Sequence, residues 1–88
     1  MKALLLAALL AGGGPHVMTA GEATAAANRE VHRVLPRFDR RSRTIRTDED
    51  AGSWRVFYES PADESAGGPV IVVVDKRTRR ARIVQSPN

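Results

Sequence analysis

The stretch "GGPVIVVVDKRTRRARIV", residues 67–84, decides the fold, because it joins five consecutive β-branched residues to a turn and a basic segment. The run from Val70 to Val74 is too short to span a membrane as a helix, and β-branched side chains favour strands. Gly68 and Pro69 precede the run, and Asp75 ends it. We interpret the run as the central, most buried strand of an antiparallel sheet.

The letters DKRT and RRARIVQ, which follow this run, predict a hairpin. DKRT is typical of a tight turn in which Asp75 accepts hydrogen bonds from backbone amides two residues on. RRARIVQ then returns as a strand. Alternation along this strand places Ala81 and Ile83 toward the core, and Arg80 and Arg82 toward water. The hairpin therefore explains why valines and arginines are neighbours in the sequence.

A helix is expected before the sheet, in "GEATAAANREVHRVLPRF". Apolar residues recur there at spacings of three and four, which is typical of one face of an amphipathic helix. They are Ala23, Ala27, Val31, Val34, Leu35 and Phe38. Pro36 disfavours helical geometry at Leu35, so we predict a helix over about Glu22 to Leu35. Thr19 and Glu22 have the spacing of a capping box.

Two more strands are expected between the helix and the valine run. "RRSRTIRT", residues 40–47, predicts a weak strand, and "DEDAGS", residues 48–53, predicts an acidic turn. In "WRVFYES" the residues Trp54, Val56 and Tyr58 point to one side and Arg55, Phe57 and Glu59 to the other, which predicts a half-buried strand with Phe57 covering an edge or a second small cluster. "PADESAGG" is a loop by composition. The predicted fold is α+β: one N-terminal helix packed on a three- to four-stranded antiparallel sheet, in a single small domain.

The first 20 residues have the layout of a secretory signal peptide, with Lys2, an apolar run over residues 3–11 and then small residues. Nine apolar residues make a helix of roughly 14 Å, about half the thickness of a bilayer's hydrocarbon core. We therefore predict a signal peptide over 1–20, a mature domain over 21–88 without a transmembrane span, and a periplasmic or secreted location. Cleavage is expected after Ala20, with Gly21 or Ala23 as alternatives. A short buried helix is the competing interpretation of residues 3–11.

No arrangement of residues indicates catalysis, a metal or a cofactor. The chain has no cysteine, so neither disulfides nor thiolate metal sites can form. His32 has no second ligand near it, and Asp48, Glu49 and Asp50 lack the alternating ligand spacing of a calcium loop. No serine lies in a G-x-S-x-G context. We therefore predict that the protein is not an enzyme.

A longer pattern, W-x-V-x-Y, then P, G-G-P and V-x-V-D-x-x-T, resembles small secreted bacterial domains. It is similar to the PepSY domain and to the nuclear transport factor 2 fold immunity proteins. The pattern is carried by Trp54, Val56, Tyr58, Pro61, Gly67, Gly68, Pro69, Val72, Val74, Asp75 and Thr78. The resemblance implies a helix packed on an antiparallel sheet and a binding or inhibitory role. It supplies no catalytic residues. Those families usually have glycine after the threonine, where this chain has Arg79.

Basic residues of the hairpin form the predicted partner-binding site. They are Lys76, Arg77, Arg79, Arg80 and Arg82. The formal net charge is +4, and such a patch can bind phosphates, anionic lipid or an acidic protein face. Nucleic acid is disfavoured because the core needs most of the few aromatic residues. Charges on an edge strand can also serve only to prevent aggregation. The expected function is an exported binding module that inhibits or neutralises an acidic protein partner. The alternative is a basic envelope protein that binds polyanions.

Overall fold

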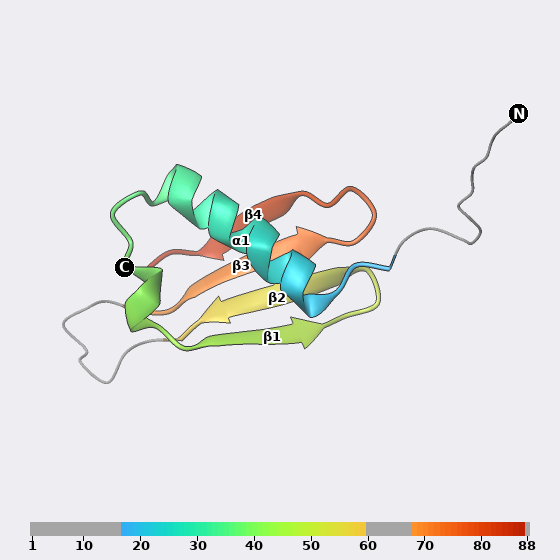
Figure 1. The fold of residues 1–88 in the computed structure, drawn as a ribbon, viewed down its shortest axis with the longest axis horizontal. Coiled ribbons are helices and arrows are strands. Elements are labelled where there is room, and N and C mark those ends of the chain that lie inside the picture. Colours follow the sequence, from blue (N-terminus) through green and yellow to red (C-terminus); the bar gives the residue numbers. More distant parts are fainter. Residues whose placement is uncertain (1–16, 60–67, 88) are drawn as a thin grey trace, which may run out of the picture.

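The computed structural model describes residues 17–59 and 68–87, which form one α-helix packed against a four-stranded antiparallel sheet (Figure 1). This confirms the predicted α+β fold. The strand order is β1-β2-β3-β4, so neighbours in sequence are neighbours in the sheet. The elements are α1 (Ala20–Val34), the 3-10 helix η2 (Arg40–Ser42), β1 (Ile45–Glu49), β2 (Ser53–Tyr58), β3 (Val70–Asp75) and β4 (Ala81–Gln85).

Strand β3 lies inside the sheet and carries much of the core, as its run of β-branched residues predicted. Val70, Val72 and Val74 are completely buried beneath α1. Ile71 and Val73 alternate with them and are half-buried on the opposite face of the sheet. β2 supplies the completely buried Val56 and Tyr58 to the same core. The two inner strands therefore hold the fold together, and β1 and β4 are its edges.

Helix α1 crosses one face of the sheet diagonally and reaches β4 with its C-terminal half (Figure 1). Its buried residues are Ala23, Ala26, Ala27 and Val31, whose mostly small side chains let the helix approach the sheet closely. Val34 was expected on this face but is 44% exposed. The helix ends at Val34, and the chain then turns, so that Leu35 packs against the core instead.

The start of α1 differs from the prediction, because the helix begins two residues before Glu22. The capping box is formed: the Glu22 N–H donates to Thr19 Oγ1 at 3.1 Å, and the Thr19 N–H donates to Glu22 Oε1 at 2.8 Å. Met18 is only 4% exposed, and its carbonyl accepts a hydrogen bond from Trp54 Nε1 at 3.2 Å. The folded unit thus includes residues that cleavage after Ala20 would remove. Residues 1–16 of the predicted signal peptide lie outside the described residues.

The predicted strand over 40–47 and the acidic turn over 48–53 were placed too early in the chain. Residues 40–42 form η2, whose cap is Asp39 accepting from the Arg41 N–H at 3.1 Å. β1 begins at Ile45 and continues through Asp48 and Glu49. Pairing with β2 and ion pairs to basic neighbours outweigh the low strand propensity of these two acidic residues. The predicted "PADESAGG" loop falls almost entirely outside the described residues.

The β3–β4 turn confirms the expected role of Asp75. Its Oδ1 atom accepts hydrogen bonds from the Arg77 and Thr78 N–H groups, both at 2.8 Å. Arg79 has a φ of 63°, in the left-handed region that favours glycine. Farther along, Val72 pairs with Ile83 while Ile71 pairs with Gln85, so β4 contains one extra residue there. This bulge leaves the first part of β4 regular.

Candidate partner-binding surface

Arg80 and Arg82 project from the outer edge of the sheet, on the side opposite the helix. Ala81 and Ile83, which alternate with them, pack against the core. Both arginines are exposed, as the alternation predicted. Among the residues that the structure describes, neither side chain forms an ion pair or a hydrogen bond. Two guanidinium groups on one well-packed strand can therefore receive an anionic partner.

The other three residues of the predicted site point elsewhere. The Lys76 ammonium is 2.7 Å from Glu49 Oε2 and 5.8 Å from the centre of the Trp54 ring, so it belongs to the β1 side of the molecule. Arg79 borders a small cleft against the N-terminal half of α1. Arg77 lies exposed in the turn beside the Asp75 carboxylate. The five residues that are close in sequence thus lie in different places in the structure. Only Arg80 and Arg82 lie together, on one side of β4.

A cleft of about 670 Å³ follows these two arginines along β4. Its residues are Glu30 and Arg33 of α1, Val73 and Asp75 of β3, Thr78 of the turn, and Arg80, Ala81 and Arg82. Glu30 and Arg33 pair with each other through two hydrogen bonds, the shorter being 2.7 Å. This hydrogen bonding from the Arg33 guanidinium lowers the pKa of Glu30. The carboxylate from the helix is therefore already satisfied within the cleft.

The second carboxylate of the cleft, Asp75, is occupied by the turn. Hydrogen bonds from the Thr78 and Arg77 N–H groups hold the pKa of Asp75 below its ordinary value. Because both acidic groups have partners of their own, neither neutralises Arg80 or Arg82 directly. The cleft therefore presents two available cations beside a helix and an open strand edge.

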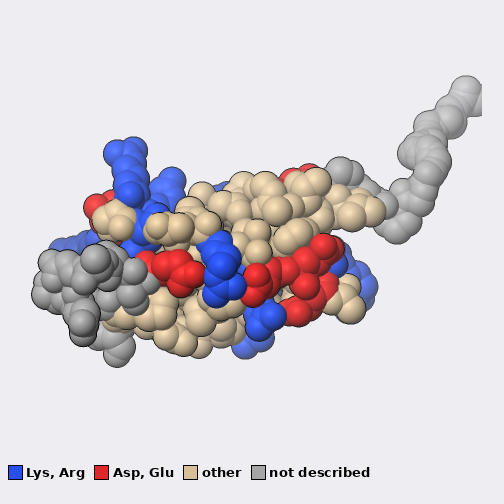
Figure 2. Space-filling view, turned by 90° about the horizontal axis from the view of Figure 1, so that it is seen from below, with Lys and Arg blue, Asp and Glu red and all other residues tan. Residues whose placement is uncertain are grey.

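Cations at the β1 edge have the opposite arrangement. Arg46 lies 2.8 Å from Asp48 and 2.9 Å from Glu59, and its guanidinium stacks 3.9 Å from the centre of the Phe57 ring. Arg55 pairs with Asp50 at 3.0 Å. Viewed toward this edge, acidic and basic side chains lie beside one another in a band (Figure 2). The three consecutive acidic residues considered as a cation site, Asp48, Glu49 and Asp50, are all used in these pairs.

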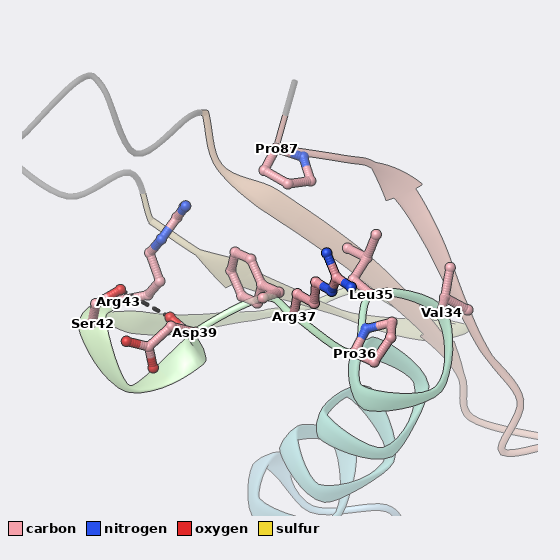
Figure 3. A pocket seen from close by; sticks show the side chains of 9 residues that line it. Val34, Leu35, Pro36, Arg37, Asp39, Ser42, Arg43 and Pro87 are labelled. Atoms are coloured by element: carbon pink, nitrogen blue, oxygen red, sulfur yellow. Dashed lines mark hydrogen bonds between the residues drawn. The ribbon is translucent and has the colours of Figure 1, made fainter.

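A second cleft, which the sequence did not reveal, lies at the C-terminal end of α1 (Figure 3). Its volume is about 590 Å³. It is lined by Val34, Leu35, Pro36, Arg37, Phe38, Asp39, Ser42, Arg43 and Pro87. These residues meet because the Gly68 N–H donates to the Pro87 carbonyl, which brings the end of the sheet beside the helix terminus. That long-range contact has no local signature in the sequence.

Arg43 in this second cleft has a structural task. Its Nη1 atom donates to the carbonyl of Gly68 at 2.8 Å, and its guanidinium lies 4.6 Å from the centre of the Phe38 ring. Phe38 in turn meets Tyr58 edge to face, with ring centres 5.8 Å apart. Burial raises the pKa of Tyr58 to about 12, and its hydroxyl donates to Asn28 Oδ1 at 2.5 Å. This end of the molecule is thus tied together through aromatic and arginine contacts.

Other candidate chemistry is sparse in the described residues. His32 is exposed on α1, and no group of three or more His, Asp or Glu side chains within residues 17–59 and 68–87 could hold a metal ion. The helices described for this chain are too short or too polar to cross a membrane.

The fold and this surface define a class: a small α+β domain with one helix on a four-stranded meander and an arginine-bearing edge. No family model matches the chain, and neither a curated protein nor a solved structure matches it. The resemblance to PepSY domains and to nuclear transport factor 2 fold immunity proteins therefore stays a prediction.

Proposed function

We propose that this protein is an exported binding module that captures an acidic protein partner through Arg80 and Arg82 and thereby inhibits or neutralises it. The proposal combines the signal-like segment over residues 1–20 with the surface on β4. We favour binding over catalysis for two reasons. The β4 edge exposes two cations, and the described residues supply no nucleophile paired with a base.

One observation carries the proposal: within residues 17–59 and 68–87, Arg80 and Arg82 form no ion pair, although acidic side chains neutralise Arg33, Arg46, Arg55 and Lys76. The backbone that carries these two cations is already ordered as part of the sheet, so only their side chains must be immobilised when a partner binds. They also attract acidic surfaces during encounter and repel basic ones. A solvated edge that only prevents aggregation would serve equally well with its charges paired, as the β1 edge shows.

The test compares two double variants for capture of partners from the native envelope fraction. Arg80→Glu with Arg82→Glu should fold normally and lose the acidic protein that the parent chain retains. The matched control, Arg40→Glu with Arg41→Glu, makes the same change in net charge at exposed positions of η2, outside the β4 edge. It should retain that protein. Full retention by the Arg80/Arg82 variant would show that the edge is only solvated.

The run of exposed arginines at 77, 79, 80 and 82 favours one alternative, a basic envelope protein that binds polyanions. The two functions differ in their response to salt. Binding to a polyanion such as heparin releases counterions, and several contacts weaken it by about 10³-fold or more between low and physiological salt. Capture of a protein through a mixed surface should persist in moderate salt. A salt series on the same two variants separates the alternatives.

A further inference from the structure

We infer that β4 accepts an extended acidic segment of the partner as a fifth strand of the sheet, with acidic residues at every second position. This inference rests on the proposed function and specifies the chemistry of the partner. Three features of the β4 edge carry it: the direction of its backbone groups, the side on which its arginines lie, and the charge of a competing copy of the same chain.

Backbone hydrogen bonds show which groups of β4 point outward. The Asp75 N–H donates to the Arg80 carbonyl at 2.9 Å, so Asp75 and Arg80 form a hydrogen-bonded pair at the start of the ladder. Bonded and non-bonded pairs alternate in an antiparallel ladder. The Arg82–Val73 pair is therefore bonded next, and Ala81 and Ile83, opposite Val74 and Val72, belong to non-bonded pairs.

The neighbouring ladder supports this assignment. The Lys76 N–H donates to the Gly52 carbonyl at 3.0 Å, and the same alternation directs the backbone groups of Val74 and Val72 toward β2. The N–H and C=O groups of Ala81 and Ile83 then point away from β3. No strand of the described sheet lies beyond β4. These two residues offer a row of donors and acceptors of the kind that an added peptide strand uses.

The side chains define what such a strand should contain. Because Ala81 and Ile83 pack toward α1, Arg80 and Arg82 lie on the opposite side of β4. Alternate residues of an added strand would face them, and carboxylates at those positions would be opposite guanidinium groups. The intervening residues would face the helix side of the cleft, where Glu30 and Arg33 already pair. Neutral or apolar side chains fit there.

A second copy of the chain is a poorer occupant of the same edge. Antiparallel pairing of β4 with another β4, with Ala81 opposite Ala81 or Ile83 of the other copy, would place arginines of the two copies directly opposite each other. Like charges on directly opposed residues destabilise a strand pair. The charge of this edge therefore selects an acidic segment over self-association.

The test titrates the purified full chain with the peptide acetyl-Glu-Val-Glu-Val-Glu-amide by calorimetry, and measures hydrogen exchange of individual amides. We expect binding together with slower exchange at the Ala81 and Ile83 amides. The same peptide with N-methyl groups on its two valines keeps its charges and loses the N–H groups that would face β4. It should bind about tenfold or more weakly, because each lost hydrogen bond weakens binding. A Lys-Val peptide should not bind.

A variant of the protein provides the second arm. Ala81→Pro removes an outward N–H without removing a bond to β3, and proline is tolerated at such edge positions. It should keep the fold and bind the acidic peptide about tenfold or more weakly. Equal binding of the parent and N-methylated peptides would overturn the added strand while leaving capture by Arg80 and Arg82 intact. Concentration-dependent dimers that protect Ala81 and Ile83 without peptide would also overturn it. Failure of the proposed function itself would appear instead as retention of the envelope partner by the Arg80/Arg82 variant.

Discussion

The two edges of the sheet use arginine in opposite ways. At the β1 edge, Arg46 pairs with acidic neighbours and covers the Phe57 ring, and Arg55 of the adjoining strand β2 pairs with Asp50. At the β4 edge, Arg80 and Arg82 have no such partners among the described residues. Both edges are charged and hence protected from casual pairing with other strands. Only the β4 edge keeps its charge available to a partner.

This difference follows from what each edge has beside it in the chain. β1 carries Asp48 and Glu49 within the strand, and Asp50 follows them directly. β4 contains no acidic residue, and the nearest one, Asp75, caps the turn through backbone N–H groups. Identical side chains thus stabilise the fold on one side and remain available on the other. The surroundings of an arginine decide its role more than its position in a cluster does.

Val72→Asp should have the largest effect, because it tests the buried core of the sheet to which both edges belong. Val72 is completely buried in β3, and a carboxylate there would lose its hydration without gaining a partner. The cost should be about 3–5 kcal/mol, comparable to the whole stability of a domain this small, so the variant should be unfolded by circular dichroism. The control is Val84→Asp, at a 46% exposed position on β4, which should melt near the parent temperature. A Val72→Asp variant with the parent melting temperature would contradict the core assignment.

The second test compares chains that begin at Val17 and at Gly21. The shorter chain lacks Thr19, the helix cap, which contributes about 1 kcal/mol, and Met18, whose burial contributes about 1.5–3 kcal/mol. It also loses the carbonyl that bonds Trp54. We expect it to be less stable by about 3 kcal/mol in urea unfolding. If export occurs as proposed, intact-mass measurement of the periplasmic or secreted protein should find a start at or before Met18. Equal stability of the two chains would remove this argument against cleavage after Ala20.

The sequence predicted the elements that depend on local patterns. The β-branched run from Val70 to Val74 identified β3 as the buried inner strand, and Asp75 marked the turn that follows. The spacing of Thr19 and Glu22 matched the capping box that the structure forms, although the helix was predicted from Glu22 and begins at Ala20. These features predict well because the energy that fixes them comes from neighbouring residues.

Features that depend on distant contacts were not predictable in the same way. Whether Lys76 belongs with the hairpin arginines depends on Glu49, 27 positions earlier. The cleft beside Phe38 depends on Pro87 approaching Gly68. Asp48 and Glu49 have low strand propensity and therefore suggested a turn, but their pairing with β2 places them in β1. For the candidate site, composition gave the set of cations, and only tertiary structure separated the paired from the available ones.

A direct test of the edge comparison is Arg46→Glu against Arg82→Glu. Arg46 is 48% exposed, so water screens its two ion pairs and each contributes little, and the contact with Phe57 adds a modest further stabilisation. We expect Arg46→Glu to lower the urea midpoint measurably, and Arg82→Glu to leave it nearly unchanged. Urea unfolding measures both. Equal losses of stability in the two variants would mean that Arg46 and Arg82 contribute alike to the fold, which would contradict the difference between the edges.

The smallest expected effect concerns the turn that leads into β4. Arg79 has a φ of 63°, a conformation that costs a residue with a side chain about 1–2 kcal/mol relative to glycine. Glycine also makes the unfolded chain more disordered, which offsets part of that gain. Arg79→Gly should therefore stabilise the domain by about 0.5–1 kcal/mol in urea unfolding.

Arg77→Gly removes the same charge from the same turn at a position without positive φ, and it should destabilise by about 0.5–1 kcal/mol. If both variants shift stability in the same direction, charge and not backbone conformation dominates this turn. Opposite shifts would show that the chain tolerates strain at Arg79, where the resembled families usually have glycine.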